Sequence, residues 1–135
     1  MSLCLVANWK LNGSKEFNHQ WALEFLRNFN GNNFSILGIA PASLYIDHLK
    51  TILTDYDIEI GSQNIDLEET GARTGEISAS MIKDLGCAFS IIGHSERRML
   101  FHETNQMICQ KLIQADNHSV IPILCIGESA EENQS

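Results

Sequence analysis

Short apolar runs alternate along this chain with longer segments of helical period. The apolar runs are residues 3–7, 35–40, 58–61, 89–93 and 120–126. Most of them are apolar at consecutive positions, so both faces of each strand must be covered. Strands of this kind that are separated by helices form a parallel sheet. The pattern therefore predicts an α/β fold and disfavours a β-sandwich.

The segments between the apolar runs carry helix signals. The first segment has an aromatic residue at every fourth position, which predicts a helix face buried in the core. Its stripe consists of Phe17, Trp21, Phe25 and Phe29, with Ser14 as the expected N-cap and Gly31 as the stop. Further helices are predicted over residues 44–53, with His48 and Lys50 on the solvent side, over 79–85 after the N-cap Ser78, and from Thr104 to Asn117.

The predicted order is five strands joined by four helices, and a further helix begins near the end of the chain. Its start is marked by a capping box, in which Ser129 and Glu132 satisfy each other's backbone donors. We therefore expect residues 1–135 to be a single partial domain that ends at the start of this helix. Two architectures fit the order. One is an open flavodoxin-like sheet, and the other is the first five strands of a (β/α)₈ barrel, which usually has about 250 residues.

The composition limits the partners and the compartment that we expect. The 17 acidic residues outnumber the 9 lysines and arginines, and the net charge of −8 disfavours nucleic acid and anionic membranes as partners. No run approaches the roughly 18 apolar residues of a membrane span, and residues 1–7 lack the basic start of a signal peptide. The four cysteines have no metal-binding spacing and are expected to be reduced. These features predict a soluble, cytoplasmic protein.

Polar segments directly follow four of the apolar runs. They are residues 8–13, 62–64, 94–98 and 127–129. In both architectures the ligand binds beyond the carboxyl ends of the strands, so these segments are the expected ligand site. Lys10 would place a compact ammonium group where it can hold an anionic group such as a phosphate. The glycine-rich fingerprints of nucleotide-binding loops are absent, which disfavours an open-sheet oxidoreductase.

His94 is the candidate for proton chemistry. It follows the fourth apolar run and precedes residues 95–98, which could begin a short helix. The positive end of a helix dipole disfavours imidazolium and would lower the pKa of His94, and a neutral ring can donate a hydrogen bond to a substrate oxygen. The remaining histidines are expected to be solvated and give no support for a metal site. They are His19, His48, His102 and His118.

Three other groups near strand ends are interpreted as structural. Cys125 lies inside the last apolar run, and we expect it to be a small buried hydrophobe because no cation adjacent in sequence lowers its pKa. Glu96 and Glu128 each follow a strand end, and either could pair with Lys10 or with an arginine.

Several segments stand together in a characteristic order and spacing. They are Ala7-Asn8-Trp9-Lys10, Gln63-Asn64, Gly71-Ala72-Arg73-Thr74-Gly75-Glu76, Ile92-Gly93-His94-Ser95-Glu96-Arg97-Arg98 and Cys125-Ile126-Gly127-Glu128. These segments resemble the signature segments of the triosephosphate isomerase family over nearly the entire chain. The resemblance implies a (β/α)₈ barrel and an isomerase of glycolysis and gluconeogenesis. Such an enzyme interconverts dihydroxyacetone phosphate and glyceraldehyde 3-phosphate through an ene-diolate, without metal or organic cofactor.

The resemblance also implies roles for individual residues. Lys10 would bind the substrate and offset developing negative charge, with Asn8 helping to place it. His94 would polarise the carbonyl and pass protons between the two oxygens. Glu96 and Ser95 would support these two groups.

A homodimer of the full-length protein is a further implication of the resemblance. The loop from Gly71 to Glu76 would dock into a second subunit, with Thr74 near the active site of that subunit. Glu76 would pair with Arg97 across the interface. Arg73 stands where the family loop commonly carries an aromatic residue, a departure that bears on how tightly the loop docks.

The chain also departs from the family in its length. The family's general base is a glutamate at the end of the sixth strand, and its glycine-rich phosphate site follows strands seven and eight, beyond the residues given. We therefore expect an N-terminal fragment that is inactive alone and poorly soluble at its open fifth strand. The alternative is a compact α/β domain that binds a phosphorylated small molecule.

Overall fold

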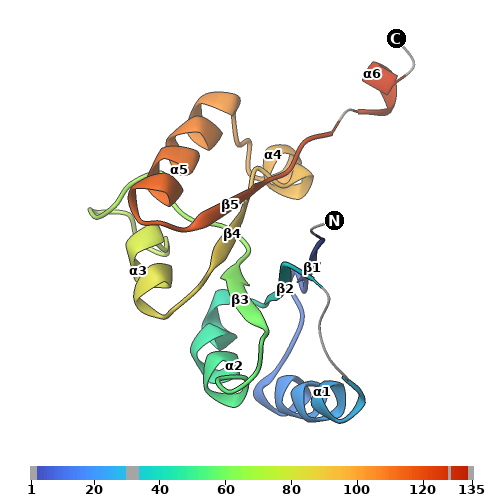
Figure 1. The fold of residues 1–135 in the computed structure, drawn as a ribbon. Coiled ribbons are helices and arrows are strands. Elements are labelled where there is room, and N and C mark those ends of the chain that lie inside the picture. Colours follow the sequence, from blue (N-terminus) through green and yellow to red (C-terminus); the bar gives the residue numbers. More distant parts are fainter. Residues whose placement is uncertain (1–2, 30–33, 128, 134–135) are drawn as a thin grey trace.

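The computed structural model describes residues 3–29, 34–127 and 129–133. Over these residues, five parallel strands form one sheet in the order in which they occur in the chain. They are β1 (Cys4–Asn8), β2 (Ile36–Ala40), β3 (Glu59–Ser62), β4 (Phe89–Ile92) and β5 (Ile121–Leu124). A flavodoxin-like sheet has the order 2-1-3-4-5, so the sequential order excludes that alternative. The strands curl as the first part of a (β/α)₈ barrel, and Figure 1 shows α1, α2, α3 and α5 in an arc outside them.

The helices for which a capping residue was predicted begin directly after that residue. The described helices are α1 (Lys15–Asn28), a 3₁₀ turn η1 (Ser43–Tyr45), α2 (Ile46–Ile52), α3 (Ala79–Asp84), α4 (Ser95–Leu100), α5 (Asn105–Asn117) and α6 (Ala130–Asn133). The hydroxyls of Ser14, Ser78 and Thr104 each accept the backbone N–H three residues ahead, at 3.1–3.2 Å. The predicted stop of the first helix, Gly31, lies outside the described residues. No helix in the described part of the chain is long and apolar enough to cross a membrane.

The capping box at the start of α6 is confirmed. The Ser129 N–H donates to the Glu132 carboxylate at 2.6 Å, and the Glu132 N–H donates to Ser129 Oγ at 3.1 Å. This reciprocal pair satisfies two of the backbone donors that a helix start leaves without partners. The backbone N–H of Ser129 lowers the pKa of the Glu132 carboxyl below its ordinary value.

The aromatic stripe of α1 is only partly buried. Trp21 stacks on Phe25 and Phe25 stacks on Phe29, with ring centroids 5.0 and 5.1 Å apart, and Trp9 meets Trp21 edge-on at 4.9 Å. Phe17, however, is 57% exposed, so the prediction that it lies in the core is wrong. An α-helix turns about 100° per residue, so a repeat of four drifts about 40° per step. The first member of the stripe has therefore turned away from the core.

The prediction that His48 and Lys50 lie on the solvent side of the helix over residues 44–53 is also wrong in part. His48 is half-buried, and its Nε2 is buried without a hydrogen-bond partner among the described residues. Its ring faces that of His19 on α1, with centroids 6.3 Å apart. Lys50 is half-buried because its Cε lies over Gly86, 3.1 Å from where a Cβ on that glycine would stand. The packing of α2 against its neighbours therefore covers both side chains.

Each face of the sheet has its own core. The outer face packs against the helices, where Ile60 and Ile92 join Leu49 and Ile82 in one buried cluster. The inner face is filled by Phe89, which is fully buried. Its ring lies directly on β2 and β3, because a Cβ built on Gly38 or Gly61 would come within 2.6 or 2.3 Å of it. These glycines let the ring fill the inside of the curl.

Burial decreases toward the two outermost strands of the described sheet. All four residues of β4 are buried, as the apolar runs predict. In contrast, Leu5 of β1 and Ile121 of β5 are 51% and 49% exposed. The expectation that both faces of every strand are covered is wrong for these two strands, because each pairs with a neighbour on one side only.

Candidate active site

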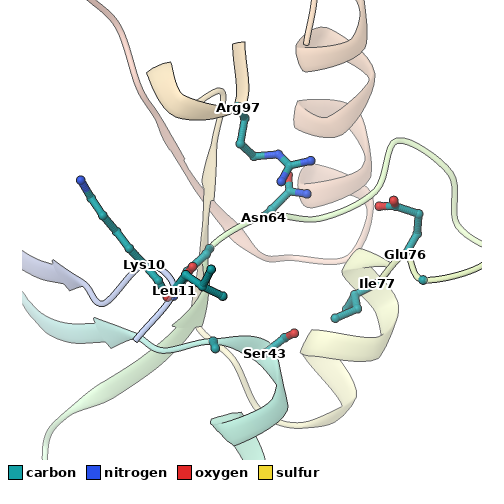
Figure 2. A pocket seen from close by; sticks show the side chains of 10 residues that line it. Lys10, Leu11, Ser43, Asn64, Glu76, Ile77 and Arg97 are labelled. Atoms are coloured by element: carbon teal, nitrogen blue, oxygen red, sulfur yellow. The ribbon is translucent and has the colours of Figure 1, made fainter. Parts of the chain in front are cut away.

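Polar residues from the ends of three strands meet around two adjoining cavities. The larger cavity has a volume of about 490 Å³ and is lined by Asn8, Lys10, Leu11, Asn12, Gln63, Asn64, His94, Glu96, Arg97, Leu100 and Phe101. The smaller cavity, of about 300 Å³, shares Lys10, Leu11, Gln63, Asn64 and Arg97 with the larger one and extends to Ser43 and Glu76 (Figure 2). The segments that follow β1, β3 and β4 thus converge. Gly127, which follows β5, lines neither cavity, and Glu128 lies outside the described residues.

Lys10 stands at the larger cavity in an unusual backbone conformation. Its φ is +55°, in the left-handed region that non-glycine residues seldom adopt. Its backbone N–H donates to Asn8 Oδ1 at 3.0 Å. The ammonium Nζ lies 2.7 Å from Glu96 Oε1, and both side chains are about half exposed. The hydrogen bond from Lys10 lowers the pKa of the Glu96 carboxyl below its ordinary value.

His94 is the N-cap of α4, as its place after the fourth run predicts. Its Nδ1 accepts the backbone N–H of Glu96 at 3.1 Å. With Nδ1 engaged as an acceptor, Nε2 is the ring nitrogen that is left to donate a hydrogen bond. Glu96 Oε2 lies 3.6 Å from the same Nδ1. Glu96 therefore stands between Lys10 and His94, and all three line one cavity.

Two other predicted residues near His94 have different surroundings. Ser95, the first residue of α4, is exposed and lines neither cavity. Arg97 lines both cavities, and its Nε donates to Glu103 Oε2 at 2.7 Å. Within the chain its carboxylate partner is thus Glu103, whereas Glu76 lies on the wall of the smaller cavity.

A buried ion-pair network lies behind the cavity wall. Lys111 Nζ donates to Glu103 Oε2 at 3.0 Å and to Asn64 Oδ1 at 2.7 Å, and its side chain is only 4% exposed. Burial lowers the pKa of Lys111 below its ordinary value. Sequence reasoning missed this lysine. Its position three residues after Ile108 and four before Ala115, on the buried face of α5, is the signal that could have found it.

The loop between β3 and α3 is held by an internal ion pair. The Arg73 guanidinium donates to both carboxylate oxygens of Asp66, from Nε and, at 2.8 Å, from Nη2. This contact lowers the pKa of Asp66 below its ordinary value. The Asp66 N–H donates to the Ile77 carbonyl at 2.8 Å, which closes the base of the loop. Thr74, near the tip, is exposed and lines neither cavity.

The remaining histidines and the cysteines offer little further chemistry. His19 and His102 are exposed, as predicted. The prediction that the His118 side chain is solvated is wrong, because its Nε2 is buried and lies 3.5 Å from Glu69 Oε1. All four cysteines are free. Cys125 lies just past the end of β5 and is only half-buried, so the prediction that it is buried in the strand is wrong in part, although its partial burial raises the pKa of the thiol. Within the described ranges no group of three potential metal ligands occurs.

Comparison with known proteins places this amino-acid sequence in a family. The sequence profile described as triosephosphate isomerase matches residues 3–135. A protein named triosephosphate isomerase from Baumannia cicadellinicola subsp. Homalodisca coagulata is 46% identical over 132 residues, which cover 96% of this chain and 51% of that protein. The same name belongs to a Blochmanniella floridana protein, 45% identical over 99% of this chain and 53% of the relative. An Escherichia coli O1:K1 / APEC protein of that name is 40% identical over 97% of this chain and 51% of the relative.

The match is long and continuous, and it includes every residue that lines the two cavities. The chain spans about half the length of the curated relatives that it matches. The curled sheet of sequentially ordered parallel strands is the one that such a family requires. This chain belongs to the triosephosphate isomerase family.

Proposed function

We propose that the protein to which this chain contributes interconverts dihydroxyacetone phosphate and glyceraldehyde 3-phosphate. The observation that carries the proposal is the meeting of Lys10, His94 and Glu96 around one cavity at the carboxyl ends of the strands. Lys10 and His94 supply two of the groups that a proton transfer next to a carbonyl needs, namely a cation for the developing oxyanion and a hydrogen-bond donor for the carbonyl oxygen.

The proposed chemistry assigns one task to each side chain. The Nε2–H of the neutral His94 ring donates to the substrate carbonyl and then passes protons between the two oxygens of the ene-diolate. Lys10 holds the anionic substrate and stabilises the negative charge that develops on it. Glu96, which is paired with Lys10 in the free site, positions the ammonium at the cavity. Asn8, through the backbone of Lys10, fixes the turn that carries this side chain.

The general base for the carbon-bound proton is not among these groups. Among the described residues, Glu96 is the carboxylate that lines the larger cavity, and it is paired with Lys10. A base that is engaged by an ammonium ion is a weak proton acceptor, as the lowered pKa of Glu96 reflects. We therefore expect residues 1–135 alone to show no isomerase turnover, since general-base catalysis commonly contributes about 10² to 10⁴-fold.

A homodimer is the second part of the proposal. Leu11, Leu100 and Phe101 are 96%, 67% and 61% exposed at the larger cavity, and apolar residues in such number at one site favour a protein partner. The ion pair between Asp66 and Arg73 holds the loop of residues 66–77 ready to dock. Light scattering of the complete gene product should give the mass of two chains, and a monomer would contradict this part.

We also assign the protein to the cytoplasm. The support is the free state of all four cysteines, which is typical of reducing compartments. Fractionation of cells that produce the protein tests this assignment.

The activity is tested on the complete gene product that carries these residues. Coupled assays in both directions should show isomerase turnover, and His94→Gln should lower kcat by about 10² to 10⁴-fold. His19→Gln, on the exposed surface of α1, is the matched control and should leave kcat unchanged. Binding of a triose phosphate without turnover would instead support the alternative of a phosphate-binding domain.

A further inference from the structure

We propose that Gln63 is a positioning residue that holds the backbone of Lys10 in its left-handed conformation and so determines where the ammonium group stands. The inference rests on the proposed function of Lys10. Gln63 follows the last residue of β3 directly, so its main chain is anchored at the end of a buried strand. Its side chain makes no ion pair and carries no proton for the reaction. Its contribution is made through the peptide of another residue.

The conformation of Lys10 needs external support. At a φ of +55° the Cβ of an L-residue crowds its own carbonyl oxygen, and such residues persist only where their surroundings hold them. Lys10 is followed by Leu11, which is 96% exposed, so packing on that side does not supply the support. The hydrogen bonds of the Lys10 peptide groups must supply it instead.

Both sides of Lys10 are held by amide side chains. Asn8 Oδ1 accepts its backbone N–H at 3.0 Å, and Gln63 Nε2 donates to its carbonyl oxygen at 2.9 Å. Gln63 Nε2 also donates to the carbonyl of Ala40, the last residue of β2, at 3.0 Å. The same carbonyl accepts the N–H of Trp9 at 3.0 Å. The amide of Gln63 thus ties the turn after β1 to the end of β2.

The contact requires this type of side chain. A terminal amide has two N–H donors on one nitrogen, which matches the two carbonyl oxygens, of Lys10 and Ala40, that Gln63 Nε2 contacts. Methionine has a similar length without a donor, and glutamate has acceptors only. Without the donor, the Lys10 peptide is free to leave the left-handed region. The ammonium group would then move away from Glu96, from which it is now 2.7 Å distant.

The test is a double-mutant cycle in the complete gene product. Gln63→Met should lower kcat/KM by about 10- to 100-fold, since a displacement of about 1 Å in a catalytic group can cost that much. The loss should vanish in a Lys10→Ala background, because Gln63 acts through Lys10 alone. Gln106→Met, on the exposed surface of α5, is the matched control and should leave kcat/KM unchanged. An equal loss in both backgrounds would show a general structural role and overturn the inference.

A structural measurement separates this inference from the proposed function. If the complete gene product has no turnover, the proposed function fails, and crystal structures of the parent and of Gln63→Met still decide the inference. A left-handed Lys10 in the parent that leaves this region in the variant supports it. A left-handed Lys10 in both overturns it. Gln63→Glu, which keeps the shape and lacks the donors, serves in the same comparison if Gln63→Met does not fold.

Discussion

Two ion pairs of similar geometry near the cavities differ in their surroundings. Lys10 and Glu96 are about half exposed, so solvent screens their attraction and the pair contributes little to stability. Lys111 and Glu103 are 4% and 1% exposed, and each has lost its hydration. A buried charge that loses its partner is left with an unfavourable environment. We infer that the first pair serves the site and that loss of one partner of the second pair destabilises the fold.

Glu103→Gln should be strongly destabilising for this reason. It removes the carboxylate that both Lys111 and Arg97 contact, and the loss of one partner from a buried pair commonly costs about 3–5 kcal/mol. Urea unfolding of the complete gene product measures the change, with Glu24→Gln on the exposed face of α1 as the control. Adding Lys111→Met should restore part of the loss, and an unchanged midpoint in Glu103→Gln would contradict the argument.

At the residue scale, the sequence predicts where in the fold a functional residue lies better than it predicts which residues that side chain contacts. The rule that ligands bind beyond the carboxyl ends of parallel strands was sufficient to bring Lys10 and His94 to one cavity. The left-handed backbone of Lys10 has no sequence signal, because lysine gives no hint of a positive φ. The partner of Arg97 within the chain has no sequence signal either, since Glu103 reaches it from a loop whose course depends on the tertiary packing.

Phe89 and the glycines under its ring make β2, β3 and β4 a single packing unit. Gly61→Ala should lower the free energy of unfolding by about 1–3 kcal/mol or more, because the added Cβ would lie 2.3 Å from the ring. Gly127→Ala is the control, since no atom lies within 4 Å of a Cβ built there and its φ is not positive. Thermal unfolding measures both. Equal stabilities of the two variants would show that the ring moves aside freely.

The loop of residues 66–77 should lose its internal support in acid. The pKa of Asp66 is below its unfolded value of about 3.9, so its stabilising contribution is complete above that pH and is lost as the pH falls through the lowered pKa. The difference in unfolding free energy between the parent and Asp66→Asn should therefore be large near neutral pH and vanish in strong acid. Asp55→Asn, at an exposed turn, is the control. A difference that does not depend on pH would refute this account.

At the scale of elements, the sequence predicts well whether a segment is a helix or a strand and where each helix begins. It predicts less well which face of a helix is buried. Ser14, Ser78 and Thr104 cap the helices that they were expected to cap, because a short hydroxyl next to a free N–H acts locally. The exposure of Phe17 and the burial of His48 depend on which neighbour covers a helix face. Tertiary packing decides which face is covered, and the four-residue spacing of apolar residues in the sequence does not.

Whether the sheet is open or part of a barrel is a property of the whole molecule and not of any single element. Both architectures have the same succession of strands and helices, so local patterns could not separate them. The structure separates them by strand order, which runs from β1 to β5 without reversal, and by the inner core around Phe89. The motifs at the strand ends favoured the barrel at the sequence level, because their spacing resembles that of one family.

The outermost strands should make the isolated 135-residue polypeptide associate with itself. Ile121 and Leu124 of β5 are 49% and 43% exposed, and Leu5 of β1 is 51% exposed, on strands that have one paired side each. Unpaired strand edges with apolar side chains are templates for pairing between chains. Light scattering should show a mass that rises with concentration, and Ile121→Lys should reduce this rise. Ile113→Lys changes an equally exposed side chain on α5, 57% exposed, away from the strand edges. An equal reduction by both variants, or a monomer at high concentration, would mean that the strand edges do not drive association.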